Sequence, residues 1–166
     1  MKLIQPDLTV DCLNDLDLSY WYERGIRGIF IDLDNTISPW RQNSVTGEAR
    51  ELIDKARQAG IMIILFTNAG EIRAREVAWS LGIGYYASAK KPFAAMYRKA
   101  MKELELTGSE VMAIGDQIFT DVLGGNLAGC TTVLTSPLAQ EEYAGTKFLR
   151  FLERLAGRKA VFHSRD

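Results

Sequence analysis

Two aspartates one residue apart, Asp32 and Asp34, carry the clearest chemical potential in this sequence. They come directly after the apolar run 28–31, which is typical of a buried parallel strand. Ligands of open α/β sheets bind just outside the carboxyl ends of such strands. Two carboxylates at that position predict a site of chemistry, and an enzyme is therefore the leading hypothesis.

Further polar residues stand at the ends of the other apolar runs and at the start of predicted helices. If the strands are parallel, all of these side chains converge on one edge of the sheet. A lysine pair directly before a proline offers two candidates for a phosphate-binding ammonium group. The additional candidates are Thr67, Asn68, Lys90, Lys91, Asp116 and Asp121.

This set of side chains indicates phosphoryl transfer. Three aspartates brought together would repel one another unless a cation were present, and hard oxygen ligands favour Mg²⁺. A lysine and a threonine hydroxyl beside them can bind phosphate oxygens. A metal, a carboxylate nucleophile, a second carboxyl for proton transfer and a phosphate clamp together describe transfer through an aspartyl-phosphate intermediate.

The elements that must position these residues alternate along the chain as strand and helix. This βαβ rhythm predicts a doubly wound α/β fold, with a parallel sheet, right-handed crossovers and helices on both faces. We expect one domain over residues 1–166, with a core at about 26–136 and appended elements at both termini. The expected strands are 26–31, 61–66, 85–86, 111–114 and 132–134, and the expected helices are 46–59, 71–81, 93–104 and 121–128.

Composition favours a soluble cytoplasmic protein. The 20 basic and 21 acidic side chains give no overall attraction to nucleic acid or to an anionic membrane. Cys12 and Cys130 lie far apart and form no metal-binding pair, as expected in a reducing compartment. The sequence shows neither the apolar stretch of a signal peptide nor one of the roughly 18 residues needed to span a membrane.

The order and spacing of these residues across 29–121 resemble the four motifs of the haloacid dehalogenase (HAD) superfamily of phosphohydrolases. The resemblance implies that Asp32 is the nucleophile and a Mg²⁺ ligand. It implies that Asp34 is the general acid and base, with its backbone carbonyl on the metal. It also implies that Thr67 binds the transferring phosphoryl group, with Asn68 in the same substrate-binding segment.

The remaining roles follow from the same resemblance. Lys91 would stabilise the charge of the phosphoryl group and of the nucleophile, while Asp116 and Asp121 would hold the metal directly or through water. Within the superfamily, a second aspartate two residues after the nucleophile is typical of phosphatases. Hydrolysis of a phosphomonoester is therefore the expected reaction.

The intervals between motifs leave no room for the cap domain that larger members of the superfamily insert. Asp32 and Thr67 are 35 positions apart, and Thr67 and Lys91 are 24 apart, each enough for little more than one crossover. We therefore expect a capless, open site. Such a site suits a substrate whose bulk lies outside it, such as a protein, a nucleic acid or a lipid headgroup, or an oligomer whose neighbour supplies the lid.

A closer resemblance is to the YqeG family of capless HAD phosphatases, which is related to the phosphatidylglycerophosphate phosphatases of mitochondria and plastids. It is carried by the segments 22–28, 32–36, 66–68, 89–92 and 115–121. It implies phosphatidylglycerophosphate or a similar phospholipid as substrate. If the protein is a phosphatase, the alternative substrates are phosphoproteins, suggested by the Asp-x-Asp-x-Thr pattern, and soluble sugar phosphates. A receiver-like signalling domain is the alternative from a different class.

Two segments could contact a membrane at its surface, although packing against the sheet explains both of them. Residues 147–158 place four apolar residues on one helical stripe with basic residues around it. The aromatic run 20–22 lies near two arginines. Packing is the favoured interpretation of each, and peripheral membrane contact is left open.

Overall fold

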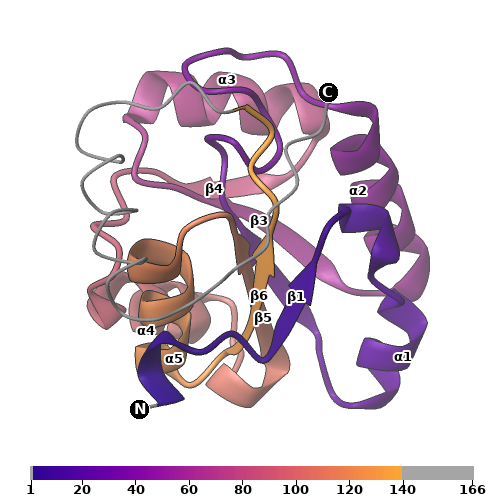
Figure 1. Cartoon of the computed structure of the whole chain (residues 1–166), viewed down its shortest axis with the longest axis vertical. Coiled ribbons are helices and arrows are strands. Elements are labelled where there is room, and N and C mark those ends of the chain that lie inside the picture. Colours follow the sequence, from indigo (N-terminus) through magenta and orange to yellow (C-terminus); the bar gives the residue numbers. More distant parts are fainter. Residues whose placement is uncertain (1, 140–166) are drawn as a thin grey trace.

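A computed structural model, in which residues 2–139 are described, contains a six-stranded parallel sheet in the order β1-β6-β5-β2-β3-β4 (Figure 1). The expectation of a doubly wound α/β fold is confirmed. The strands are β1 (Leu8–Val10), β2 (Gly28–Ile31), β3 (Met62–Phe66), β4 (Gly84–Tyr86), β5 (Val111–Gly115) and β6 (Thr131–Thr135). The helices are α1 (Leu18–Glu23), α2 (Gly47–Ala59), α3 (Glu71–Leu81), α4 (Ala94–Glu103) and α5 (Leu123–Ala128).

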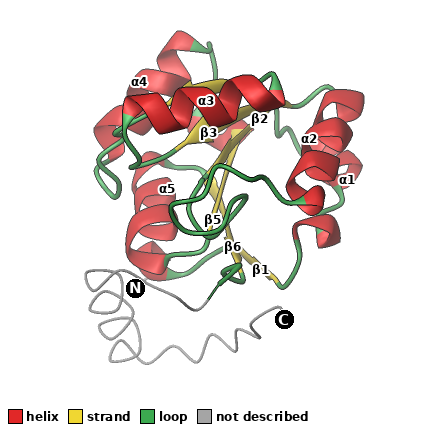
Figure 2. Cartoon of the chain, turned by 90° about the horizontal axis from the view of Figure 1, so that it is seen from above, coloured by secondary structure: helices red, strands yellow, loops and turns green. Residues whose placement is uncertain are grey.

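The central strands are buried on both faces because helices cover the sheet from both sides. In β2, Ile29 and Ile31 point into the cluster formed with α2 and α3, whereas Phe30 points into the cluster formed with α4. This alternation follows from the two-residue period of a strand. It explains why the run reads as continuously apolar. Figure 2 shows α1 and α2 on one side of the sheet and α4 and α5 on the other.

Helix boundaries follow the capping residues in the sequence. The side chain of Thr46 accepts a hydrogen bond from the backbone N–H of Ala49 at the start of α2, as a capping threonine does. Gly60 ends α2 with a φ of 77°, a left-handed conformation that glycine adopts without steric cost. The expected ends of α2 and α3 therefore agree with the structure, because local chemistry determines them.

The first 25 residues are not wholly an appendage, contrary to expectation. Residues Leu8–Val10 form β1, which pairs in parallel with β6 at one edge of the sheet. Asp7 extends this pairing, because its carboxylate accepts a hydrogen bond from the N–H of Thr132 at 2.8 Å. A strand of three residues with only one buried side chain has too short an alternating pattern to be recognised from the sequence.

The helical segment expected at 121–128 begins three residues earlier, and its first turn is π-helical instead of α-helical. A π-helical turn, Ile118–Val122, precedes α5. Such wide turns often occur at functional sites. Asp121 is the fourth residue of this turn, and its buried side chain belongs to the candidate site described below.

The aromatic run 20–22 is divided between the core and the surface. Trp21 packs against the core cluster, as expected, but Tyr20 and Tyr22 are exposed. The guanidinium groups of Arg24 and Arg27 lie over the rings of Tyr20 and Tyr22, respectively. The core-packing interpretation is therefore correct for Trp21 alone.

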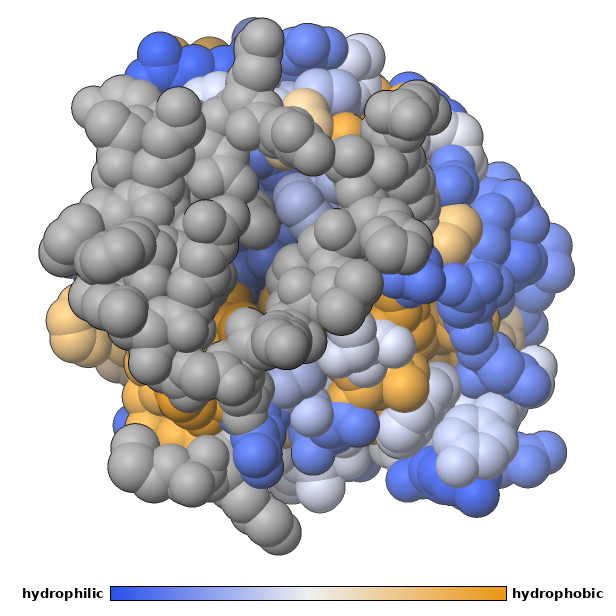
Figure 3. All heavy atoms as spheres, in the orientation of Figure 1, coloured by the Kyte–Doolittle hydropathy of each residue, from blue (hydrophilic) through white to orange (hydrophobic). Residues whose placement is uncertain are grey.

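Two features of the described residues concern membrane contact: the polarity of the surface and the lengths of the helices. Figure 3 shows a mainly hydrophilic surface over α2. Within residues 2–139, every helix is too short or too polar to cross a membrane. The segment 147–158, for which surface contact was considered, lies outside the described residues.

The role of β1 can be tested with Asp7→Ala. This substitution leaves the buried N–H of Thr132 without its carboxylate acceptor, and we expect a loss of about 1–3 kcal/mol in the free energy of unfolding. Urea denaturation measures it, with Asp54→Ala as control. Asp54 lies on the exposed face of α2 in an ion pair with Arg57, so its loss should change stability by less than about 0.5 kcal/mol. Equal stability of the two variants would show that β1 is not anchored through Asp7.

Candidate active site

The predicted site residues lie at the carboxyl ends of three adjacent strands. Asp32 and Asp34 follow β2, Thr67 follows β3 and Asp116 follows β5. From β2 the chain proceeds through β3 to β4, and it then crosses over to β5 on the opposite side of β2. The site therefore lies where the strand order reverses, which is the usual ligand position in doubly wound sheets.

The ammonium group of Lys91 joins the ends of these strands. Its Nζ lies 2.7 Å from Oδ1 of Asp32 and 2.5 Å from Oδ1 of Asp121. Nζ also donates a hydrogen bond to the carbonyl of Phe66 at 3.1 Å. The side chain of Lys91 is only 3% exposed. The favoured member of the lysine pair is thus buried among the predicted site residues, whereas Lys90 is exposed.

Asn68 holds the segment that carries Lys91. Its Oδ1 accepts a hydrogen bond from the backbone N–H of Lys91 at 2.8 Å, and its Nδ2 donates to the Lys91 carbonyl at 3.3 Å. Both ends of the amide are therefore engaged with the backbone. The sequence predicts Asn68 as part of a substrate-binding segment. In the structure its side chain instead positions the backbone of Lys91.

Thr67 is buried at the end of β3. Its backbone N–H donates to Tyr86 and its carbonyl accepts from Ala89, which fixes the residue between two loops. Oγ1 accepts a hydrogen bond from the N–H of Ala69 at 3.0 Å. Because the hydroxyl acts as acceptor in that bond, its own proton can still be donated to a phosphate oxygen.

Asp121 reaches the site because the π-helical turn directs it back toward β5. Its Oδ2 accepts a hydrogen bond from the N–H of Gln117 at 3.2 Å. A β-carbon at Gly115 would overlap with the carboxyl group of Asp121. Glycine at the end of β5 is therefore required for the carboxylate to occupy this position.

Three buried carboxylates form a cluster that fits a metal ion. Asp32, Asp116 and Asp121 each offer an oxygen, and these oxygens lie within 4.8 Å of one another. All three residues are buried, and Lys91 is the one ammonium group in direct contact with them among the described residues. Oxygen-only ligands and an excess of negative charge are the features that favour a hard divalent cation such as Mg²⁺.

The electrostatics of the cluster agree with this fit. Burial raises the pKa of Asp32 to about 7; Lys91 opposes the rise, and Asp121 and Asp34 add to it. Burial acts to lower the pKa of Lys91, but the carboxylates of Asp121 and Asp32 outweigh it and raise the pKa above its usual value. Lys91 therefore stays charged, while the ionised form of Asp32 lacks sufficient compensating positive charge.

Asp34 lies apart from this cluster and has different partners. Its Oδ1 forms an ion pair with a guanidinium nitrogen of Arg73 at 2.7 Å and accepts a hydrogen bond from the backbone N–H of Arg41 at 3.2 Å. Arg73, in the first turn of α3, did not emerge from the sequence. The one feature of the sequence that could have indicated Arg73 is its place as a basic residue in the first turn of a helix that starts at the active edge of the sheet.

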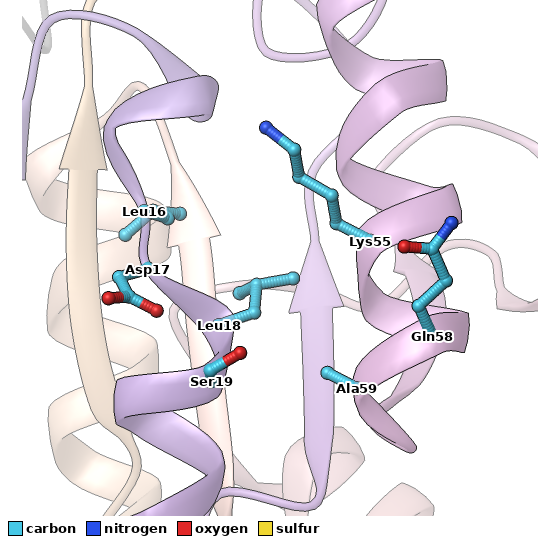
Figure 4. Close-up of a pocket in the computed structure, with 7 residues that line it drawn as sticks. All are labelled: Leu16, Asp17, Leu18, Ser19, Lys55, Gln58 and Ala59. Carbon is cyan, nitrogen blue, oxygen red and sulfur yellow. The ribbon is translucent and has the colours of Figure 1, made fainter.

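A separate hollow of about 380 Å³ lies between α1 and α2 (Figure 4). Its charged groups already have partners: Asp17 caps α1 through the N–H of Tyr20, and Lys55 pairs with Glu51 at 2.8 Å. None of the predicted site residues lines it. The lining residues are Leu16, Asp17, Leu18, Ser19, Lys55, Gln58 and Ala59.

Comparison with known proteins places this site in a family. The family model for haloacid dehalogenase-like hydrolases matches residues 38–129. The chain is 33% identical to the probable phosphatase YqeG of Bacillus subtilis over 153 residues, which cover 92% of this chain and 89% of the relative. It is 27% identical to the chloroplastic/mitochondrial phosphatidylglycerophosphate phosphatase 1 of Arabidopsis thaliana, over 85% of this chain and 43% of the plant protein.

A solved structure supports the fold. The cobalt-bound deoxy-D-mannose-octulosonate 8-phosphate phosphatase of Haemophilus influenzae superposes with a TM-score of 0.55 at 17% identity, covering 76% of this chain and 75% of that one. The family match also favours a hydrolase over a receiver-like signalling domain. With the motif residues assembled at the switch point of the sheet, the chain belongs to the haloacid dehalogenase-like hydrolases, as a phosphatase of that family.

Proposed function

We propose that the protein hydrolyses phosphomonoesters with Mg²⁺, through an aspartyl-phosphate formed on Asp32. The observation that carries this proposal is the contact of the Lys91 ammonium with Asp32 and Asp121, inside a cluster of three buried carboxylates. This arrangement places a nucleophilic carboxylate, a permanent positive charge and an oxygen-only metal site at one point. A Mg²⁺ ion held by Asp32, Asp116 and Asp121 would neutralise phosphate charge and keep Asp32 ionised.

In the first step, a carboxylate oxygen of Asp32 attacks phosphorus as the bond from phosphorus to the leaving oxygen breaks. Asp34 gives a proton to that oxygen, so the product leaves as an alcohol. In the second step, water attacks the phosphorus of the acyl phosphate and passes its proton to Asp34. Inorganic phosphate leaves, and Asp32 is regenerated. Throughout, the Lys91 ammonium offsets the negative charge of Asp32 and of the phosphoryl group, and the Thr67 hydroxyl donates to a phosphoryl oxygen.

We propose phosphatidylglycerophosphate or a similar phospholipid as the substrate. The similarity to the plant phosphatidylglycerophosphate phosphatase supports this choice. Within the described residues, one helix, α2, lies between Asp32 and Thr67, and one helix, α3, between Thr67 and Lys91. With no cap domain in either interval, a headgroup could enter while the acyl chains stay outside.

A soluble sugar phosphate is the second candidate substrate. The chain is 26% identical to the ribulose-1,5-bisphosphate 5-phosphatase of Halopiger xanaduensis and to the glyceraldehyde 3-phosphate phosphatase of Pyrococcus abyssi. Each match covers about three quarters of this chain and 53% of the relative. These two relatives favour a small phosphorylated metabolite over a phosphoprotein as the alternative.

The nucleophile assignment predicts the effect of Asp32→Asn. An amide is a much weaker nucleophile than a carboxylate, so kcat should fall roughly 10³-fold or more with the fold retained. Phosphate release from p-nitrophenyl phosphate measures the loss, and circular dichroism checks the fold. Asp54→Asn, on the exposed face of α2, serves as the matched control and should keep full activity. Activity of Asp32→Asn within tenfold of the wild type would rule out a covalent role for this residue.

The metal assignment predicts a thermal shift that requires no turnover. Saturating Mg²⁺ should raise the melting temperature of the wild type by about 5 °C, because it binds only the folded carboxylate cluster. Asp116→Asn should remove most of that shift, and without metal it should melt above the wild type, because one buried negative charge is gone. Asp54→Asn should keep the full shift. A wild type that shows no Mg²⁺-dependent shift contradicts the site.

The substrate is tested with a panel of phosphomonoesters at fixed Mg²⁺. The panel contains a short-chain phosphatidylglycerophosphate, ribulose 1,5-bisphosphate, glyceraldehyde 3-phosphate and a phosphoserine peptide. We expect the phospholipid to have a kcat/KM at least about tenfold above the others, a difference of about 1.4 kcal/mol in transition-state binding. A higher value for either sugar phosphate would instead establish the second candidate.

A further inference from the structure

The two carboxylate oxygens of Asp34 are in different situations. Oδ1 is held by a guanidinium nitrogen of Arg73 at 2.7 Å and by the backbone N–H of Arg41 at 3.2 Å. In the described part of the chain, Oδ2 accepts no hydrogen bond. The carboxyl group is therefore fixed in rotation by one oxygen, while the other is available for exchange of a proton.

The guanidinium group of Arg73 has further partners in the loop that follows β2. One nitrogen donates to the backbone carbonyl of Gln42 at 2.6 Å, and Nε donates to Oδ1 of Asn43 at 3.2 Å. One turn further along α3, Glu76 accepts a hydrogen bond from the amide of the same asparagine at 3.0 Å. Arg73 thus holds Asp34 and the loop together.

This arrangement needs an arginine. Three different nitrogens of one planar group each meet a separate acceptor, and the side chain is 21% exposed. A lysine ammonium could pair with Asp34, but as a compact point charge on a flexible stem it would not reproduce the planar fork that reaches all three acceptors. A guanidinium with three acceptors in fixed positions is a rigid support for the carboxylate that it touches.

We propose that Arg73 is the positioning residue for proton transfer by Asp34. By holding Oδ1, it makes Oδ2 the oxygen that gives a proton to the leaving oxygen and later takes one from water. This inference rests on the proposed function. In the first step the Oδ2–H bond breaks as the bond from phosphorus to the leaving oxygen breaks and the bond from Asp32 to phosphorus forms. In the second step Oδ2 takes the proton from the attacking water.

The proposal predicts an effect that depends on the leaving group. An alkoxide leaves poorly without a proton, whereas p-nitrophenolate leaves readily as an anion. The ratio kcat/KM reports the steps up to release of the leaving group and so excludes the later attack by water. Loss of Asp34 positioning should therefore lower kcat/KM for an alkyl phosphate far more than for p-nitrophenyl phosphate. General acid catalysis contributes roughly 10²–10⁴-fold to the rate. An incorrectly positioned Asp34 should lose a large part of that factor.

The experiment compares Arg73→Met, Arg73→Lys and Arg75→Met with the wild type, all as the full chain with Mg²⁺. Methionine keeps the length of the side chain and its helix propensity but removes every donor. Arg75 lies on the same helix with its guanidinium 5.4 Å from the ring centre of Trp79, so Arg75→Met controls for loss of a charge from α3. The substrates are p-nitrophenyl phosphate and two alkyl phosphates, namely a short-chain phosphatidylglycerophosphate and glyceraldehyde 3-phosphate.

We expect Arg73→Met to lower kcat/KM at least about tenfold for the alkyl phosphates and less than about threefold for p-nitrophenyl phosphate. Arg73→Lys should recover part of the alkyl activity by pairing with Asp34, and Arg75→Met should match the wild type. Equal losses on both classes of ester, or no loss on either, would overturn the positioning role. A wild type inactive on every ester would instead overturn the proposed function, so the two failures are distinguishable.

Discussion

The ion pair of Lys91 with Asp32 and Asp121 is the interaction on which the rest of the site depends. It joins the end of β2 to the π-helical turn that follows β5, through side chains that are almost fully buried. Breaking such a pair by removing one partner leaves an uncompensated charge in a poorly solvated interior, which is costly. The same burial that makes the pair necessary also raises the pKa of Asp32 to about 7.

Several features of the fold serve to bring these charges together. The reversal of strand order places β2 between β3 and β5. Asn68 binds both backbone groups of Lys91, and Gly115 leaves space for the carboxylate of Asp121. The loop after β2 and helix α3 hold Asp34 through Arg73 in a separate environment. Two neighbouring aspartates thus have distinct surroundings, as expected when one is to act as a nucleophile and the other in proton transfer.

The sequence predicts the sheet and the residues at its active edge because apolar runs, capping residues and parallel connections are local features with clear periods. Thr46 and Gly60 determine the ends of α2 in this way. The short edge strand β1 and the contacts of Arg73 were beyond such prediction. Strand β1 depends on pairing with β6 some 125 residues later, and the Arg73 contacts depend on where a loop places Gln42. These are tertiary contacts without a local pattern.

A covalent phosphoryl group on Asp32 can be detected by chemical trapping during turnover. Acid quenching followed by borohydride reduction converts an acyl phosphate to an alcohol, so a phosphorylated aspartate becomes homoserine. Peptide mass spectrometry then locates the change. We predict substrate-dependent homoserine at position 32, while Asp34 and Asp121 stay unchanged. An unmodified Asp32 during active turnover, or homoserine at another position, would show that Asp32 is not the nucleophile.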